Sequence, residues 1–145
     1  MKITLKSLLM VAVGAFLLTA CNKDSKSPEE LLTGPSCWSY IKNETFNVAT
    51  NQWQDDPLED CEKDDCINFR DDDTVVFDEG ATKCDPADPQ STTFSWSLSA
   101  DGKTLTLSDP SSGTFTGTVV ELSESRFVFE LNILGFRSRQ TFQAK

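Results

Sequence analysis

The chain has 145 residues with 13 basic and 23 acidic side chains and no histidine, so its net charge is −10 at neutral pH. Such a charge is repelled by phosphate backbones, which argues against nucleic acid as a partner. Without histidine, no Ser-His-Asp or Cys-His catalytic group and no histidine-ligated zinc site can form, and only carboxylate chemistry remains. Because no nucleophile motif accompanies the acids, we expect a protein that is not an enzyme and uses no cofactor.

The first twenty residues have the pattern of a secretory signal peptide. Lys2 and Lys6 make a basic start, Leu8 to Leu18 form an apolar run, and the small residue Ala20 follows. The run is too short to cross a bilayer as a helix, which takes about 20 residues. We therefore expect residues 1–20 to be cleaved and to take no part in the fold.

The end of that segment, Leu18-Thr19-Ala20-Cys21, resembles the lipobox of bacterial lipoproteins, in which the cysteine is acylated and becomes the new N-terminus. Acyl chains contribute about 0.8 kcal/mol per buried methylene, so a multiply acylated Cys21 would hold the protein on a membrane. An ordinary signal peptide followed by a free cysteine is the alternative. We expect a lipid-anchored protein of the cell envelope, in the outer membrane of a Gram-negative bacterium, with residues 21–30 as lipidated cysteine and polar tether.

A short helix is predicted directly after the tether. Ser27 is suited to the N-cap, Pro28 to the first helical position, and Glu30 to the third position of a capping box. Gly34 and Pro35 should end the helix within two turns. The result would be a short helical plug ahead of the strands.

From Trp38 onward the sequence reads as an all-β domain. Short runs of β-branched and aromatic residues are separated by clusters of Asp, Gly, Pro and Ser. No segment after Leu32 has a helical period. The eight predicted strands are 38–43, 66–69, 74–77, 92–98, 104–107, 114–122, 126–133 and 137–143.

The apolar positions in these strands alternate with polar ones, as in sheets that have one buried face. The clearest examples are "RFVFELNI" and "TFSWSL", and Asp101-Gly102 is a strong hairpin signal after the second of them. Successive hairpins favour a small antiparallel up-and-down β-barrel over residues 31–145, because closure removes exposed strand edges. A two-sheet sandwich is the alternative. The inward residues are Phe94, Trp96, Leu98, Phe127, Phe129, Leu131 and Ile133.

Four cysteines remain when Cys21 carries lipid. In an exported chain of this size they indicate two disulfides, with three pairings open. A four-thiolate zinc site would need close CxxC pairs, which the spacing does not supply. The four are Cys37, Cys61, Cys66 and Cys84.

Three segments carry a family resemblance: "LLTGPSCWSY", "CEKDDCINFRDDDTVVFDEGATKCDPADPQ" and "FSWSLSADGKTLTL". They are similar to the lipocalin-like domain family found in lipoproteins of gut-dwelling Gram-negative bacteria, and the resemblance covers roughly Leu31 to the C-terminus. It implies a small lipocalin-like barrel that is exported and membrane-tethered, with no established enzymatic activity. The resemblance also implies a Cys61–Cys84 bridge. A Cys37–Cys66 bridge lies outside the family pattern, but both cysteines begin predicted strands, so the pairing is geometrically reasonable.

An eight-stranded barrel either fills with side chains or holds one small molecule. With 10 Phe and 3 Trp, filling is the default, and a cavity for a small apolar ligand is the alternative. We therefore hold two functions: a non-enzymatic binding module, and a structural or protein-interaction lipoprotein whose exterior, around Thr114 to Leu122, docks a partner. The candidate ligand residues are Trp38, placed at the barrel entrance, and Phe94, Trp96, Phe127, Phe129 and Leu131.

An acidic cluster raises a calcium hypothesis, because hard cations prefer several carboxylate oxygens. The register of a calcium loop is absent, however, and charge runs are usually solvated loops. We therefore predict no metal site. The cluster consists of Asp55, Asp56, Glu59, Asp60, Glu62, Asp64 and Asp65.

Overall fold

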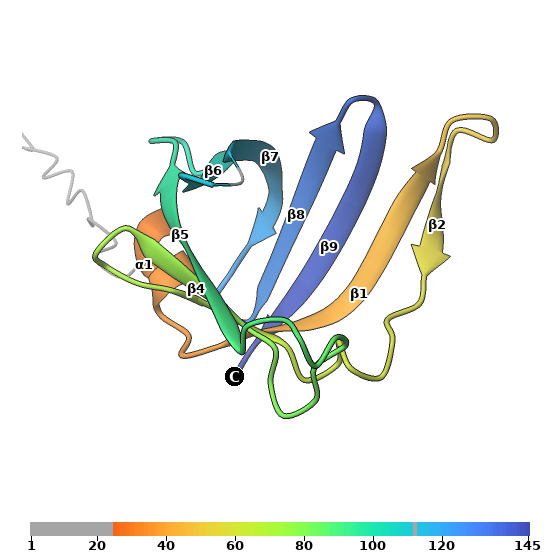
Figure 1. Cartoon of the computed structure of the whole chain (residues 1–145). Helices are drawn as coiled ribbons and strands as arrows, with labels where there is room; N and C mark the ends of the chain where they lie inside the picture. The colour runs from red at the N-terminus through yellow and green to blue at the C-terminus, as the bar shows by residue number, and fades with distance from the viewer. Residues whose placement is uncertain (1–24, 112) are drawn as a thin grey trace, which may run out of the picture.

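The structure is a computed structural model that describes residues 25–111 and 113–145. Its elements are one helix and nine strands (Figure 1): α1 (Pro28–Thr33), β1 (Trp38–Asn47), β2 (Gln52–Asp56), β3 (Cys66–Phe69), β4 (Thr74–Asp78), β5 (Ser91–Leu98), β6 (Thr104–Asp109), β7 (Gly113–Leu122), β8 (Arg126–Ile133) and β9 (Phe136–Ala144).

The nine strands form one antiparallel sheet that closes on itself. Its order is β2-β1-β3-β4-β5-β6-β7-β8-β9, and a further pairing of β1 with β9 closes the ring. The predicted up-and-down barrel is therefore confirmed, and all eight predicted strands are present. The sandwich alternative is wrong, because the inner faces belong to one continuous sheet.

β2 is the strand that the sequence did not predict, and it changes the shape of the barrel. β1 pairs with β3 only through Trp38 and Ser39, whereas its second half, from Asn43 to Asn47, pairs with β2. Over its length β1 also pairs with β9, with a bulge between Tyr40 and Lys42. Because a bulge bends its strand, β1 leaves the wall halfway along and opens a gap between itself and β3.

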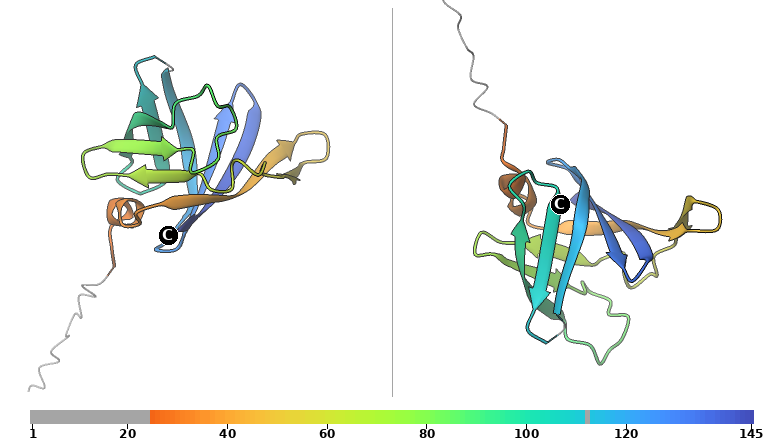
Figure 2. Two further views of the ribbon diagram at one scale, coloured as in Figure 1. Left: turned by 60° about the horizontal axis from the view of Figure 1, so that its bottom comes forward. Right: turned by 90° about the horizontal axis from the view of Figure 1, so that it is seen from above.

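The barrel has two different ends. One end, as the strand directions in the ladders show, carries α1, the C-terminus and the β3–β4, β5–β6 and β7–β8 turns. The opposite end carries the β6–β7 turn, the β8–β9 turn and the long β4–β5 loop. The left view of Figure 2 shows this separation, with α1 and the C-terminus below and these loops above.

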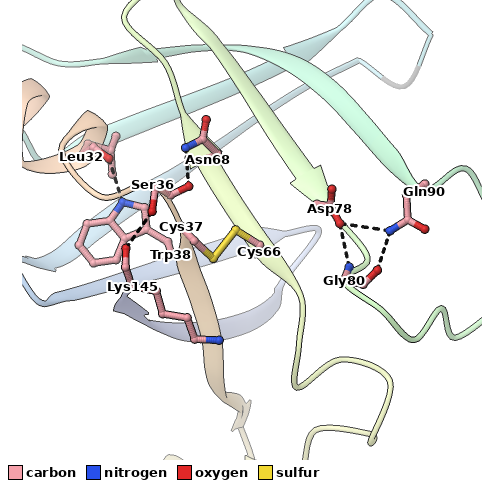
Figure 3. Close-up of a disulfide and its surroundings, with 10 residues drawn as sticks. All are labelled: Leu32, Ser36, Cys37, Trp38, Cys66, Asn68, Asp78, Gly80, Gln90 and Lys145. Carbon is pink, nitrogen blue, oxygen red and sulfur yellow. Dashed lines mark hydrogen bonds between the residues drawn. A yellow bond between two sulfur atoms is a disulfide. The ribbon is translucent and has the colours of Figure 1, made fainter.

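The helix closes the first end. Ser27 and Glu30 make the predicted capping box, with the Ser27 N–H donating to Glu30 Oε2 at 2.7 Å. Leu32 is fully buried, and its carbonyl accepts a 2.8 Å hydrogen bond from Trp38 Nε1 (Figure 3). The helix α1 therefore packs on the indole ring of Trp38. We call the end of the barrel that α1 covers the closed end.

Both disulfides considered from the sequence are present. Cys37–Cys66 joins the starts of β1 and β3, with Cα atoms 5.5 Å apart (Figure 3), and Cys61–Cys84 joins the loop before β3 to the loop after β4, with Cα atoms 5.2 Å apart. The first bridge reinforces the shortest ladder of the barrel. The second ties two loops together at the end opposite the helix.

Candidate functional site

The half of the barrel away from the closed end contains a cavity of about 420 Å³. This volume is within the range of roughly 300–1,000 Å³ usual for small-molecule sites. All of its lining residues are apolar except Thr92 and Gln140. Strands β3 to β9 all contribute to the wall. We call this space the apolar cavity.

An aromatic floor separates the apolar cavity from the closed end. The Phe127 ring lies 5.8 Å from Trp38 and 6.0 Å from Phe69, measured between centroids, and Phe69 makes an edge-to-face contact with Trp96 at 5.4 Å. Such rings each bury a large area and prefer tilted contacts. The barrel is thus filled with side chains between the floor and the closed end, and hollow on the other side of the floor.

The structure brings four of the six candidate ligand residues together around the apolar cavity: Phe94, Phe127, Phe129 and Leu131. Trp38 and Trp96 do not line it. The placement of Trp38 at the barrel entrance is wrong, because the indole is fully buried at the closed end and bonded to Leu32. Trp96 is held at the floor, where its Nε1 donates to the Arg70 carbonyl at 3.1 Å.

Several lining residues were missed although their strands were predicted. Each stands at one of the alternate positions of its strand whose side chains point inward, so the period of two was the signal that could have identified them. Phe142 is an example, because it pairs directly with Phe127, which is among the candidate ligand residues predicted from the sequence. The other missed apolar residues include Phe69, Phe77, Leu105, Leu107 and Phe115.

The mouth of the apolar cavity lies at the end opposite the helix, beside the β8–β9 hairpin. Ile133 and Phe136 face each other at the tip of the ladder, with the same parity as the cavity-lining residues below them. Both side chains are exposed, and so is Leu134 in the turn between them. An apolar lip therefore borders one side of the opening.

A smaller pocket of about 140 Å³ lies in the gap between β1 and β3, and we call it the acidic annex. Its polar lining includes Tyr40, Asp65, Asp78 and Glu79. Burial raises the pKa of Tyr40 to about 12, so its hydroxyl stays protonated. Burial and then the neighbouring acids, Glu79 first among them, raise the pKa of Asp65 to about 6.

The acidic cluster considered for calcium does not converge on one point. Asp55 pairs with Lys42 and Asp60 with Lys63, while Asp64 Oδ2 accepts from the Ala81 and Thr82 amides. Across the described ranges, one group has three potential ligand atoms close together. It combines Glu59 with the disulfide-bonded Cys61 and Cys84, whose sulfurs are not available as thiolates.

The predicted signal peptide and the lipid site at Cys21 fall on residues 1–24, outside the described residues, so they stay predictions. The same holds for the first part of the tether. Within the described part of the chain, no helix has the length and apolar character needed to span a bilayer.

Comparison with known proteins supports the fold. The chain matches the model of the lipocalin-like domain over residues 32–129. No curated protein and no solved structure matches it. The match covers more than half of the chain and runs from α1 into β8, while β9, which closes the barrel, lies beyond it. The chain therefore belongs to the lipocalin-like domain family.

Proposed function

We propose that this protein is a non-enzymatic binding module that holds a small apolar ligand inside its barrel. The apolar cavity carries the proposal: it is large enough for a small molecule, opens at one end and is lined almost entirely by aliphatic and aromatic side chains. Membership of a family with a binding fold supports it. The absence of histidine from the sequence removes the commonest general base.

A cavity-filling variant tests this proposal. Leu107 lines the apolar cavity and is only partly buried, so Leu107→Trp would place an indole in the space a ligand would occupy. We expect the native protein to bind the neutral fluorescent probe N-phenylnaphthylamine saturably at one site. Leu107→Trp should weaken that binding at least about tenfold, a loss of about 1.4 kcal/mol of binding free energy.

Val120→Trp is the matched control, because Val120 lies exposed on the outside of β7. This variant should bind the probe like the native protein, and circular dichroism of both variants should show unchanged β-structure. A native protein without a saturable site would contradict the proposal, as would undiminished binding by Leu107→Trp. Either result would favour the structural or protein-interaction lipoprotein, for which a filled interior suffices.

We further propose that the domain is anchored to the outer membrane through lipid on Cys21. The lipobox-like sequence at Leu18 to Cys21 supports this. The described chain fits it as well, because Lys26 pairs with Glu124 at 2.7 Å, in the β7–β8 turn of the closed end. A tether would therefore enter at the end away from the cavity mouth.

A further inference from the structure

Resting on the proposed function, we propose that the ligand is an amphiphile with a protonated amine: its apolar body fills the apolar cavity and its ammonium group lies in the acidic annex. Two features carry this proposal. The two spaces adjoin, and no lysine or arginine of the described residues pairs with the carboxylates of the annex.

The apolar cavity and the acidic annex share part of their walls. Ile67, Phe77, Gln140 and Phe142 line both the apolar cavity and the acidic annex. These side chains come from β3, β4 and β9, the strands on either side of the gap that β1 leaves when it turns toward β2. The two spaces therefore lie side by side, and the proposed ligand would extend from one to the other past these shared side chains.

The pairing of β3 with β4 brings the carboxylates of the annex together. Ile67 pairs with Phe77, and Cys66 pairs with Asp78. Asp65 directly precedes Cys66 and Glu79 directly follows Asp78, so both lie at the same end of this ladder. Both line the annex together with Asp78, so three acids gather where the apolar wall ends.

The charge of the annex is uncompensated within the described chain. No lysine or arginine in residues 25–111 and 113–145 forms an ion pair with Asp64, Asp65, Asp78 or Glu79. Asp65 Oδ1 is buried and has no hydrogen-bond partner. A carboxylate in this position gains most from a cation that arrives with its own hydrogen-bond donors, as an ammonium group does.

Aromatic rings complete the annex. Tyr40 and Phe142 stack with centroids 5.2 Å apart, and both line the annex together with Phe77. Ring faces attract cations, by about 0.5–2 kcal/mol depending on desolvation. An anionic head group would instead meet Asp65 and Glu79 at close range, so fatty acids should bind worse than amines with the same chain.

Three ligands with one chain and different head groups test the inference: decylamine, decanol and decanoate, each measured by displacement of N-phenylnaphthylamine at pH 7.5. We expect decylamine to bind at least about tenfold more tightly than decanol, and decanoate to bind most weakly. Equal affinities for the amine and the alcohol would overturn the inference and leave the proposed function standing. Failure of both to bind would overturn both.

A charge-removing variant locates the head group. Asp65→Asn keeps the side-chain size, and we expect it to lower the ratio of decylamine to decanol affinity about tenfold. Asp71→Asn is the matched control, because it makes the same change in the exposed β3–β4 turn at the closed end. An unchanged ratio in Asp65→Asn, or an equal fall in Asp71→Asn, would contradict the assignment. Should Asp65→Asn fail to fold, the three-ligand comparison on the native protein still decides.

The pH dependence supplies an independent readout. The groups around Asp65 are Tyr40 from β1, Asp78 from β4, Glu79 directly after β4, and Gln140 from β9, with Glu62 and Asp64 in the loop of Asp65 itself. Protonation of Asp65 below about pH 6 should reduce the preference for decylamine over decanol, while the amine itself stays charged. A preference that is constant from pH 7.5 to pH 5 would contradict the role of this carboxylate.

Discussion

Ionised Asp65 opposes folding, although the same carboxylate is where the proposed ammonium group would lie. Its pKa is raised from 3.8 to about 6, first by burial and then by the charges of Glu79 and Asp64. A carboxyl group that holds its proton more tightly in the folded state is best accommodated when protonated. Its ionisation therefore opposes folding, with a penalty that begins near pH 4 and is complete above about pH 6.

Asp65→Asn should consequently stabilise the protein at neutral pH. A pKa difference of this size corresponds to about 3 kcal/mol for a fully buried group, and solvent at this partly buried side chain reduces the expected gain to about 1 kcal/mol. Thermal unfolding at pH 7.5 should show a melting temperature higher by about 4 °C. The gain should shrink between pH 6 and pH 4, and a variant less stable than the native protein at pH 7.5 would contradict the prediction.

Some residues of the site could be predicted from the sequence pattern of their own strand, and others depend on contacts between distant segments. Phe94, Phe127, Phe129 and Leu131 could be predicted because alternation within one strand fixes the face of each side chain. The position of Trp38 could not, because the closed end is set by where α1 folds back, and that contact joins Trp38 to Leu32. The carboxylates of the annex lie in acidic segments around the ends of β3 and β4 that show no alternation, and the pairing of these two strands is what brings them together.

Among the elements, β2 illustrates the limit of sequence patterns most clearly. Its sequence, QWQDD, has one apolar residue and four polar or acidic ones, so no alternation marks it as a strand. Its stability comes from pairing with the outer half of β1 and from the outer-face contact of Trp53 with Phe46, 5.3 Å apart. Arg139 stacks on the same indole at 4.1 Å. Arg139 is far from β2 in the sequence, and Phe46 is joined to Trp53 by a turn that was not predicted, so the sequence pattern alone did not indicate these contacts.

The Cys37–Cys66 bridge should matter more for the cavity than Cys61–Cys84 does. Their sequence separations of 29 and 23 residues give similar loop-closure contributions of roughly 3–4 kcal/mol. The first bridge, however, reinforces a ladder of only two residue pairs between β1 and β3, beside the annex. The second joins loops outside the barrel wall.

Replacing each cystine by two serines separates these effects. Both variants should lose a comparable free energy of unfolding in urea titrations, by the loop-closure argument. Only the Cys37→Ser/Cys66→Ser variant should also lose probe affinity under conditions where it remains folded, because β1 and β3 can then separate. Equal probe affinity in the two folded variants would show that the ladder and the Asn68–Ser36 hydrogen bond of 2.6 Å close the barrel without the disulfide.

At the scale of the whole molecule, the barrel has a clear polarity. The closed end carries α1 and the C-terminus (Figure 2). The cavity mouth and the acidic annex lie toward the other end. A lipid at Cys21 would thus hold the closed end nearer the membrane. The net charge of −10 for the whole chain would also repel such a domain from anionic head groups.

This polarity predicts that anchoring leaves binding intact. The acylated protein in phospholipid vesicles should bind decylamine with the same affinity, within about twofold, as a soluble form. The soluble form lacks residues 1–20 and carries Cys21→Ser, and empty vesicles correct for partition of the amine into lipid.

A flotation gradient tests the anchor itself. The acylated form should rise with the vesicles and the Cys21→Ser form should stay below, because only acyl chains supply the buried methylenes that hold the protein on the vesicle. If the Cys21→Ser form also floats, the strands themselves contact lipid. If anchoring abolishes binding, the mouth faces the bilayer, contrary to the expectation from the position of Lys26 beside Glu124 at the closed end.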